Sequence, residues 1–540
     1  MQKQWEWAKQ PEKLNDVEKL KIQKDGLDII EDIQQYAKTG FESIPAEAFT
    51  LFKWAGVYQQ KPKEDGYFMM RVRIPGGELS SQQLRTIAKI GTLYGRDLID
   101  ITTRQALQYH WLKIEDMPDI FNRLAEVGLC SFEACGDCPR QIVGNPLAGI
   151  DGHELIDTRP IVDQLEKTFL MNREFSNLPR KYKISISSSM YNPGNAQIND
   201  LAFTPAVKVL DGEEVLGFHV WVGGGLSNRP HLAKQLDMFI RPEQVVDVAV
   251  GVTTVFRDNG YREKRHKSRL KFLVADWGAE KFLQVLTELI GTYPTRGEDK
   301  TVDWNAGYYV GVHPQRQEGL SYVGLNVPVG RTNSQEMFEL ADLADQYGSG
   351  SIRATVSQNL ILPDIPNEKV EQLLQEPLLR RLNPSPKQFV AYTVSCTGNE
   401  FCNLALTETK GLMHNVAEYL DKELQLDNPV RLHINGCPNN CGQQPIADIG
   451  LLGGKVKTSA GMIEAYTMAI GGHLFGEGRF NTQLKGRIPA GDVPSVLKQL
   501  LLFYKENKLP LENFTQFVDR LGVEPIQERL DQILNQVVAS

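Results

Sequence analysis

Residues 73–95, RIPGGELSSQQLRTIAKIGTLYG, return in altered form as residues 326–348, NVPVGRTNSQEMFELADLADQYG. The two copies are offset by 253 residues, so that Pro75, Gly77 and Tyr94 recur as Pro328, Gly330 and Tyr347. The same offset aligns TTRQAL at 102–107 with TVSQNL at 355–360. A constant offset over so long a window indicates an internal duplication.

Each copy predicts strands beside a helix. YFMMRVRIPGG (67–77) alternates like a strand, with its two faces formed by Phe68, Met70, Val72 and Ile74 on one side and Tyr67, Arg71 and Arg73 on the other. SSQQLRTIAKIGTLYG (80–95) then has apolar residues at helical spacing. IDITTRQALQYHW (99–111) predicts one further strand.

A second recurrence has an offset of 248 residues, which pairs Asp200 with Asp448 and WVGGGL (221–226) with AIGGHL (469–474). It also places Lys183 opposite Arg431. The chain therefore has the order A–B–A′–B′ with pseudo-twofold symmetry. Because both repeats mix strands and helices, the expected class is α+β (α/β). A crevice between the two halves is the expected place for a cofactor.

Composition restricts the function classes. Of the 540 residues 41% are hydrophobic and 23% charged, and the net charge is −8, which argues against a generally basic nucleic-acid-binding surface. No apolar run is long enough to span a membrane, and the start MQKQWEWAKQPEK lacks the apolar core of a secretory signal. Seven thinly spread cysteines argue against a disulfide framework and predict a reducing, cytoplasmic location.

The repeats differ where chemistry is expected. Arg71 corresponds to Gly324, and Arg104 corresponds to Ser357, so that the first A unit keeps cations that the second lacks. Conversely, B′ has clustered cysteines that B lacks. One half is therefore expected to bind anions and the other a metal.

The clustered cysteines are Cys396 and Cys402 with five residues between them, followed by Cys437 and Cys441 with three residues between them. Four thiolates can bind zinc or a 4Fe–4S cluster, and the wide first spacing disfavours zinc. The alternative is four unrelated buried cysteines. The turn formers around Cys437 offer backbone N–H groups that can hydrogen-bond cluster sulfurs.

The contexts CTGNEFC (396–402) and GCPNNCG (436–442) resemble the signature of the assimilatory nitrite and sulfite reductases, and the resemblance covers essentially the whole chain. It implies a sirohaem and a 4Fe–4S cluster held by Cys396, Cys402, Cys437 and Cys441. It also implies that Cys441 ligates the sirohaem iron, that ferredoxin is the electron donor, and that the protein is a monomer.

The resemblance makes the A units ferredoxin-like half-domains and the B units reductase domains. The expected boundaries are 1–50 for an N-terminal arm, 51–130 and 296–375 for the two half-domains, 131–295 for the anion and sirohaem side, and 376–540 for the cluster-bearing domain.

Sirohaem carries eight carboxylates, and the substrate is an anion, so many cations are expected. Matched to the family motifs, the residues around the substrate are Arg71, Arg140, Lys181 and Lys183, and the sirohaem contacts are Arg104 and Gln108. For any one of these the alternative is a solvated surface charge.

Lys183 bears on the substrate, because related nitrite reductases usually have Asn there and sulfite reductases Lys. An ammonium about 4 Å away is worth roughly 4 kcal/mol per unit of anion charge at an effective dielectric of about 20 before desolvation, which favours dianionic sulfite. The motifs CTGNEFC and GCPNNCGQ look more like the nitrite branch. We therefore expect sulfite reduction to sulfide, with nitrite reduction to ammonia as the alternative.

Other features carry further hypotheses. Cys138 and Tyr67 are candidates for a thioether at the pocket, or for a free thiol beside an unmodified tyrosine. YREKRHKSRLK (261–271) predicts a solvated helix face, a sirohaem contact or a ferredoxin dock. WVGGGLSNRP is no dinucleotide motif, so electrons must come from a separate carrier. A redox sensor without turnover and a structural zinc protein are the rival classes.

Overall fold

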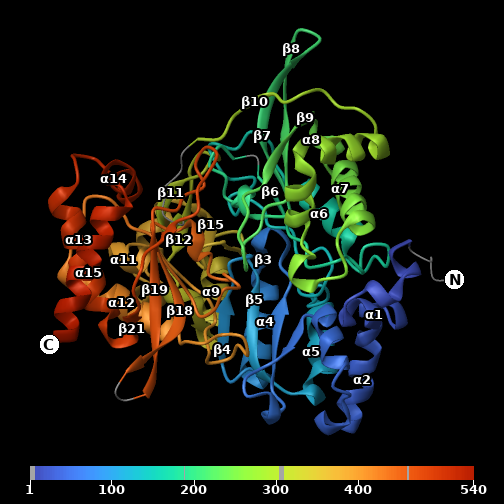
Figure 1. Cartoon of the computed structure of the whole chain (residues 1–540), viewed down its shortest axis with the longest axis horizontal. Helices are drawn as coiled ribbons and strands as arrows, with labels where there is room; N and C mark the ends of the chain where they lie inside the picture. Colours follow the sequence, from blue (N-terminus) through green and yellow to red (C-terminus); the bar gives the residue numbers. More distant parts are fainter. Residues whose placement is uncertain (1–5, 188, 303–308, 459–460, 540) are drawn as a thin grey trace.

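The computed structural model describes residues 6–187, 189–302, 309–458 and 461–539. These residues form four β-sheets with helices packed against them, and the chain order A–B–A′–B′ is visible in the course of the ribbon (Figure 1). The expected mixed class with duplicated ferredoxin-like units is confirmed. No helix in this described part of the chain is both long and apolar enough to cross a membrane.

The two A units each build a five-stranded sheet around one long helix. The first sheet has the order β1 (Val57–Gln59), β2 (Phe68–Val72), β5 (Leu107–Leu112), β4 (Leu98–Ile101) and β13 (Arg331–Asn333). The second has the order β11 (Gly311–Pro314), β12 (Leu320–Leu325), β15 (Leu360–Pro366), β14 (Ser351–Ala354) and β3 (Glu78–Ser80). The helices are α4 (Ser81–Tyr94), α5 (Met117–Glu126), α9 (Ser334–Tyr347) and α10 (Asn367–Leu374).

The register of these sheets repeats the sequence offset. Arg71 pairs with Gln108 across β2 and β5, and Gly324 pairs with Ile361 across β12 and β15, so that both partners move by 253 residues. Each unit also lends one short strand to the other, because β13 pairs with β4 and β3 pairs with β14. The two A units are thus joined by a reciprocal strand exchange.

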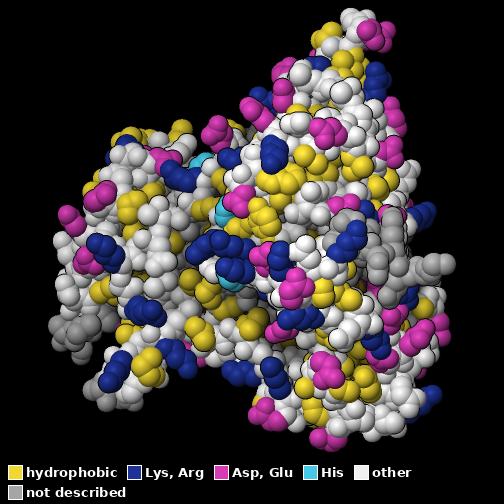
Figure 2. Space-filling model, turned by 45° about the vertical axis from the view of Figure 1, so that its right-hand side comes forward, with side chains coloured by type: hydrophobic (Ala, Val, Ile, Leu, Met, Phe, Trp, Pro, Cys, Tyr) yellow, Lys and Arg dark blue, Asp and Glu magenta, His cyan; other side chains and the backbone are white. Residues whose placement is uncertain are grey.

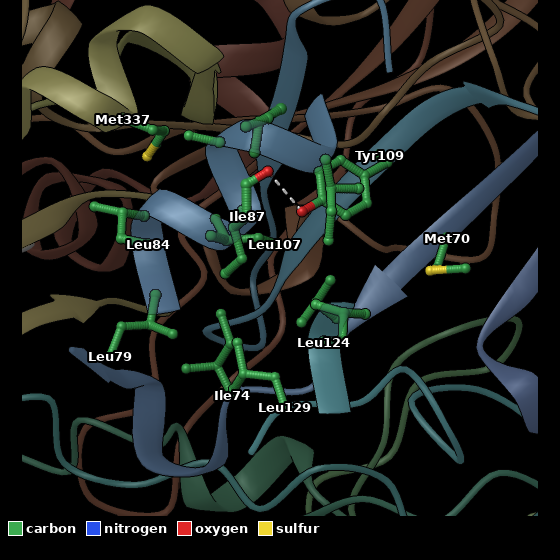
Figure 3. Packing of buried hydrophobic residues seen from close by; sticks show 14 of the residues in the cluster. Met70, Ile74, Leu79, Leu84, Ile87, Leu107, Tyr109, Leu124, Leu129 and Met337 are labelled. Atoms are coloured by element: carbon green, nitrogen blue, oxygen red, sulfur yellow. Dashed lines mark hydrogen bonds between the residues drawn. The ribbon is translucent and has the colours of Figure 1, made fainter. Parts of the chain in front are cut away.

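The sequence explains why α4 and α9 begin where they do. Ser80 caps α4 in a capping box with Gln83, and Asn333 caps α9 in the same way with Glu336. Both helices bury their apolar faces in one shared core, in which Leu84 and Ile87 of α4 lie near Met337 of α9 (Figure 3). The hydroxyl of Tyr109 donates to the carbonyl of Ile87 at 2.8 Å, so the buried phenol has a partner.

The two B units have a second shared pattern, a parallel strand pair followed by a long antiparallel hairpin. In B the sheet consists of β6 (Ile184–Ile186), β7 (Leu201–Leu210), β8 (Glu213–Val222), β9 (Lys234–Ile240) and β10 (Glu298–Asp299). It is covered by α6 (Arg159–Phe169), α7 (Val245–Asn259) and α8 (Leu270–Ile290). The hairpin of β7 and β8 projects from the body (Figure 1).

B′ repeats this layout. Its strands are β16 (Thr393–Ser395), β17 (Leu432–Asn435), β18 (Ile449–Thr458), β19 (Gly461–Ile470), β20 (Thr482–Gln483) and β21 (Ile488–Pro489). Its helices are α11 (Gln388–Ala391), α12 (Lys410–Glu423), α13 (Val493–Asn507), α14 (Phe514–Leu521) and α15 (Val523–Ala539). Ile184 pairs with Leu201 in B and Leu432 with Ile449 in B′, an offset of 248 residues for both partners.

The N-terminal segment is a packed part of the molecule, built from α1 (Asp16–Gln23), α2 (Ile29–Thr39) and α3 (Ala48–Leu51). Ile29 and Ile33 enter the core of the A units. Lys21 is buried with Glu18 at 2.6 Å and Asp137 at 3.6 Å, so α1 is tied to the B unit by ion pairs.

One expected strand is wrong. Residues 99–111 form a hairpin of β4 and β5 instead of one strand, because the N–H of Thr102 donates to the carbonyl of Ala106 at 2.9 Å and Gln105 has a φ of 57°. Arg104 therefore lies in a turn, and it does not share a strand face with Gln108.

Candidate active site

The cysteines gather at the carboxyl ends of two parallel strands. Cys396 directly follows β16, and Cys437 comes two residues after β17. The N–H of Cys396 donates to the carbonyl of Ile434 at 3.2 Å, and the N–H of Gly436 donates to Sγ of Cys396 at 3.2 Å. The loop around Cys437 thus supplies the kind of N–H···S contact that stabilises thiolates in iron–sulfur proteins.

Cys441 lies close enough to the other three thiols to affect their pKa values. Burial raises the pKa of Cys396 to about 12, and the neighbouring Cys441 adds to the rise. Burial also raises the pKa of Cys402 and Cys437, and Cys441 contributes to both. Within the described residues no three His, Cys, Asp or Glu side chains converge on a point where one ion would sit. The thiols therefore lie close enough to affect one another's pKa values through Cys441, but they do not surround a point where a single metal ion would sit.

The loop that carries Cys441 is held in a fixed shape and touches the first half of the chain. Asn435 accepts from the N–H of Gly442 through Oδ1 at 2.6 Å, which closes the turn. The hydroxyl of Thr103, in the turn between β4 and β5, donates to the carbonyl of Cys441 at 2.9 Å. Cys441 is exposed, and it lies where the first A unit meets B′.

The structure brings the predicted cations together near Cys441. Burial lowers the pKa of Arg104 to about 9, and the adjacent Arg140 and Arg71 lower it further. Burial also lowers the pKa of Lys181 to about 7 and that of Lys183 well below its usual value. Repulsion from Arg104 and Lys181 is the next largest cause for Lys183, whereas Cys441 favours both charged lysines.

These cations have mostly neutral partners. Arg71 donates to Oε1 of Gln108 at 3.1 Å, and Arg104 donates to the carbonyl of Gln141 at 2.6 Å. Arg140 donates to the carbonyls of Gly136 at 2.7 Å and Ala134 at 3.1 Å. The Nε atom of Arg71 is buried without a hydrogen-bond partner among the described residues. The cluster therefore holds positive charge without matching carboxylates, as an anion site requires. Figure 2 also shows Lys and Arg side chains gathered near the middle of one face, although the net charge is −8.

Tyr67 and Cys138, the candidates for a thioether, have different hydrogen-bond partners. The hydroxyl of Tyr67 accepts from Arg96 at 2.9 Å, and Sγ of Cys138 donates to the carbonyl of Cys135 at 3.0 Å. Instead Tyr58 of β1 lies beside Cys135, and burial together with that thiol raises the pKa of Tyr58. Because Arg140 and Arg71 also act on Tyr58, its phenol belongs to the cationic cluster. The strand β1 has only three residues, too few to show an alternating pattern, so sequence reasoning could not find Tyr58.

The basic run 261–271 is largely used inside the protein. Its buried and half-buried cations contact acidic groups or carbonyls elsewhere: Arg262 pairs with Glu18, Arg265 with Asp137, Arg269 with Asp200, and Lys271 with the carbonyls of Leu226 and Asn228. Only part of the run is exposed, including Lys264 and Lys267. A wholly solvated helix face is therefore excluded. Arg431, the counterpart of Lys183 in the second B unit, is likewise paired with Asp448.

Two family models match the chain. The nitrite/sulfite reductase ferredoxin-like half domain matches residues 59–127 and 313–379. The nitrite and sulphite reductase 4Fe-4S domain matches residues 135–292 and 388–537. The chain belongs to the nitrite and sulfite reductase family.

Relatives with both substrate names are similar over nearly the whole length. Ferredoxin–nitrite reductase of Synechococcus elongatus is 44% identical over 499 residues, which cover 91% of this chain and 96% of the relative. Sulfite reductase [ferredoxin] 1 of Mycolicibacterium paratuberculosis is 36% identical, with 96% of each chain covered. The solved structure of the Mycobacterium tuberculosis NirA protein matches with a TM-score of 0.89 and 35% identity over 95% of this chain and 97% of that one.

The family's cofactors are a 4Fe–4S cluster and sirohaem. The residues present fit both groups. Three thiols close to Cys441, together with an N–H···S contact, suit a cluster, and basic side chains with neutral partners suit a macrocycle that carries many carboxylates.

Proposed function

We propose that this protein is a ferredoxin-dependent sulfite reductase that catalyses the six-electron reduction of sulfite to sulfide. The observation that carries this proposal is Lys183, a half-buried lysine among Arg104 and Lys181. No hydrogen bond or ion pair involves its ammonium within the described part of the chain. When it is protonated, this additional basic side chain favours a dianion over a monoanion.

Nitrite is the second candidate substrate. It is supported by the 44% identity to the Synechococcus elongatus enzyme, which exceeds the 36% identity to the mycobacterial sulfite reductase. Since both relatives match over at least 91% of this chain and 96% of their own length, whole-chain identity weighs less here than the chemistry of one side chain in the anion site.

The proposed roles follow the geometry. Cys396, Cys402, Cys437 and Cys441 hold the cluster, and Cys441 also serves the sirohaem. Arg104 and Gln108 hold the macrocycle. Arg71, Arg140, Lys181 and Lys183 bind the anion, and the lysines supply protons as S–O bonds break. When bound, the two cofactors would supply the electrons and a redox-active iron for the reduction of the anion. A lysine whose pKa lies near 7, as for Lys181, can both donate and recover a proton at neutral pH.

The electron donor is proposed to be ferredoxin, arriving over a cationic groove of about 600 Å³ between the second A unit and α12. The groove is lined by six Lys and Arg residues, namely Arg331, Arg380, Arg381, Lys387, Lys410 and Lys422. Two contacts support its closeness to the cluster. Arg331 pairs with Glu400 at 2.9 Å, and Glu400 is two residues from Cys402. Cys396 lies close enough to Lys410 to raise the pKa of that lysine, although burial lowers it overall. An acidic carrier would be steered to this surface.

Steady-state kinetics test the proposal. The purified holoenzyme is assayed with sulfite and with nitrite, using reduced ferredoxin and, in parallel, reduced viologen. We expect kcat/KM for sulfite to exceed that for nitrite. A higher value for nitrite would assign the alternative, and a coloured holoenzyme without turnover on either anion would favour a redox sensor. We also propose a monomeric, cytoplasmic enzyme, to be checked by light scattering and cell fractionation.

A further inference from the structure

Lys183 and Arg431 occupy the same place in the two B units. Each directly precedes the first strand of its parallel pair. The N–H of Lys183 donates to Oδ2 of Asp200 at 2.9 Å, and the N–H of Arg431 donates to Oδ2 of Asp448 at 2.8 Å. The backbone frame is therefore the same on both sides, and any difference in role lies in the side chains.

In B′ the side chain at this place is neutralised locally. Arg431 donates to Asp448 through Nε at 3.1 Å and through Nη2 at 2.9 Å. The hydroxyl of Thr515, in the first turn of α14, adds a hydrogen bond to Oδ1 of Asp448 at 2.7 Å. The cation next to this strand is thus paired with the aspartate that precedes β18, and it also donates to the carbonyl of Gly472 at 2.8 Å.

In B the corresponding aspartate, Asp200, pairs with a residue from another part of the chain. Arg269, the residue before α8, donates to Asp200 through Nε at 3.0 Å and through Nη2 at 2.7 Å, and both side chains are buried. Room for this guanidinium depends on Gly225, where an added Cβ would lie 2.6 Å from Nη2 of Arg269. The equivalent position in B′ is His473, so only the first B unit has a glycine there.

Because Arg269 occupies Asp200, the ammonium of Lys183 has no carboxylate partner among the described residues. No hydrogen bond or ion pair involves this ammonium within the described residues. The backbone N–H of Lys183 nevertheless donates to the carboxylate of Asp200. The charged groups that face the ammonium are Arg104, Lys181, Arg269 and Cys441. Without Arg269 on Asp200, Lys183 would stand at the position from which Arg431 pairs with Asp448.

We propose that Arg269 is a positioning residue for the anion site: by occupying Asp200, it keeps the Lys183 ammonium available to the anionic substrate. This inference rests on the proposed function only in that Lys183 meets the anion. Arg269 would thus have a role that differs from both functions expected of the run 261–271, which were contact with sirohaem and docking of ferredoxin.

The test compares anion affinity in four holoenzymes: wild type, Arg269→Gln, Lys183→Met and the double variant. The dissociation constant for sulfite is read from the change in the sirohaem absorption spectrum. We expect Arg269→Gln to raise Kd at least about 10-fold in the presence of Lys183 and by less than about 2-fold in the Lys183→Met background, because contacting residues show such non-additivity. A 10-fold effect in both backgrounds would mean that Arg269 acts through its own charge, and the proposal would be overturned.

Conservative and matched variants complete the experiment. Arg269→Lys keeps an ion pair with Asp200 and should give an intermediate Kd, which also serves if Arg269→Gln does not accumulate as holoenzyme. Arg431→Gln removes the equivalent ion pair in B′ and should leave the sulfite Kd within about 2-fold of wild type. An equal rise for Arg431→Gln would assign the effect to general loosening of the fold and would contradict the proposal.

A structural measurement separates this inference from the function. In a crystal structure of cofactor-free Arg269→Gln, we expect Nζ of Lys183 within ion-pair distance of Asp200. Finding Lys183 unmoved would overturn the positioning role whatever the substrate is. If Lys183→Met alone leaves the sulfite Kd unchanged, the role of Lys183 in the proposed function fails, while the crystallographic outcome still reports on Arg269.

Discussion

Tyr58 and Cys135 lie side by side at the cationic cluster, although 77 residues separate them in the chain. Tyr58 comes from the edge strand β1, and Cys135 comes from the loop that also presents carbonyls to Arg140. The phenol and the thiol therefore form one chemical unit with Arg140. Replacing either residue should therefore change the energetic effect of replacing the other.

The first prediction is a double-mutant cycle on this pair. Tyr58→Phe and Cys135→Ala should each raise the sulfite KM several-fold, and their effects should be non-additive by about 0.5–3 kcal/mol because the groups are in contact. Tyr67→Phe and Cys138→Ala are the matched control. Since these two residues have different partners, their effects should add within about 0.5 kcal/mol. Coupling in the second pair and none in the first would contradict the placement.

The second prediction concerns substrate choice. Lys183→Asn removes one positive charge from the anion site, so KM for sulfite should rise at least about 10-fold, while KM for nitrite changes less because nitrite carries one charge fewer. Competition assays with both anions in one cuvette measure the ratio directly. Lys208→Asn, on the projecting β7–β8 hairpin, controls for the general loss of a lysine. An equal loss for both anions would remove the reason for preferring sulfite.

The third prediction places the electron donor. Arg380→Glu with Lys422→Glu reverses two exposed charges in the groove and should raise KM for ferredoxin about 10-fold at low salt, with a smaller effect at high ionic strength. Turnover with reduced viologen should stay at the wild-type rate, because the small dye needs no docking surface. Lys264→Glu with Lys267→Glu, the exposed part of the basic run, is the comparison pair. A loss confined to that second pair would move the docking site there.

The fourth prediction concerns the cluster ligands. Cys402→Ala should abolish cluster assembly, leaving less than about a tenth of the iron and no measurable turnover, because a missing thiolate leaves one iron without its ligand. Cys130→Ala, a cysteine outside the quartet, should keep its iron and its spectrum. Iron analysis and visible absorption give both readouts. A colourless wild-type protein loaded with zinc would support the structural zinc alternative.

The fifth prediction is a pH effect on stability. Burial raises the pKa of Glu133 to about 7, well above its ordinary value of 4.5, so the folded state holds a proton that the unfolded state has lost. The stabilisation is complete below about pH 4.5 and disappears as pH rises through about 7, by up to about 3 kcal/mol. Thermal midpoints between pH 5 and pH 8 should therefore fall less steeply in Glu133→Gln than in wild type. The exposed Glu64→Gln should keep the wild-type slope, and parallel slopes for all three proteins would refute this account.

Much of the fold follows from the sequence because the duplication repeats in the hydrogen bonds themselves. The offset that aligns Arg71 with Gly324 also aligns their cross-strand partners Gln108 and Ile361. The alternation in β2 was visible because a buried strand face needs every second residue to be apolar. The turn at Thr102–Ala106 was missed because Gln105, which adopts a positive φ, carries no Gly or Pro signal.

Site residues could be predicted from the sequence only where they belong to a recognisable motif. Spacing alone singled out the four cysteines, and matching positions singled out Lys181 and Lys183. Partners chosen by the tertiary fold gave no signal: Tyr58 comes from a strand of three residues, and Asp200 meets Arg269 from 69 positions away. Pairing across such distances depends on which loops the two sheets bring together.

The short strands β3 and β13 have a consequence for ancestry. Each completes the sheet of the opposite half, so neither half of the chain could close its own sheet if it were made alone. Two identical subunits that traded this strand would have formed an obligate homodimer, the outcome expected of domain swapping. A gene fusion that joined such partners end to end would have kept the swap, and from then on each half was free to lose either the cations or the thiols.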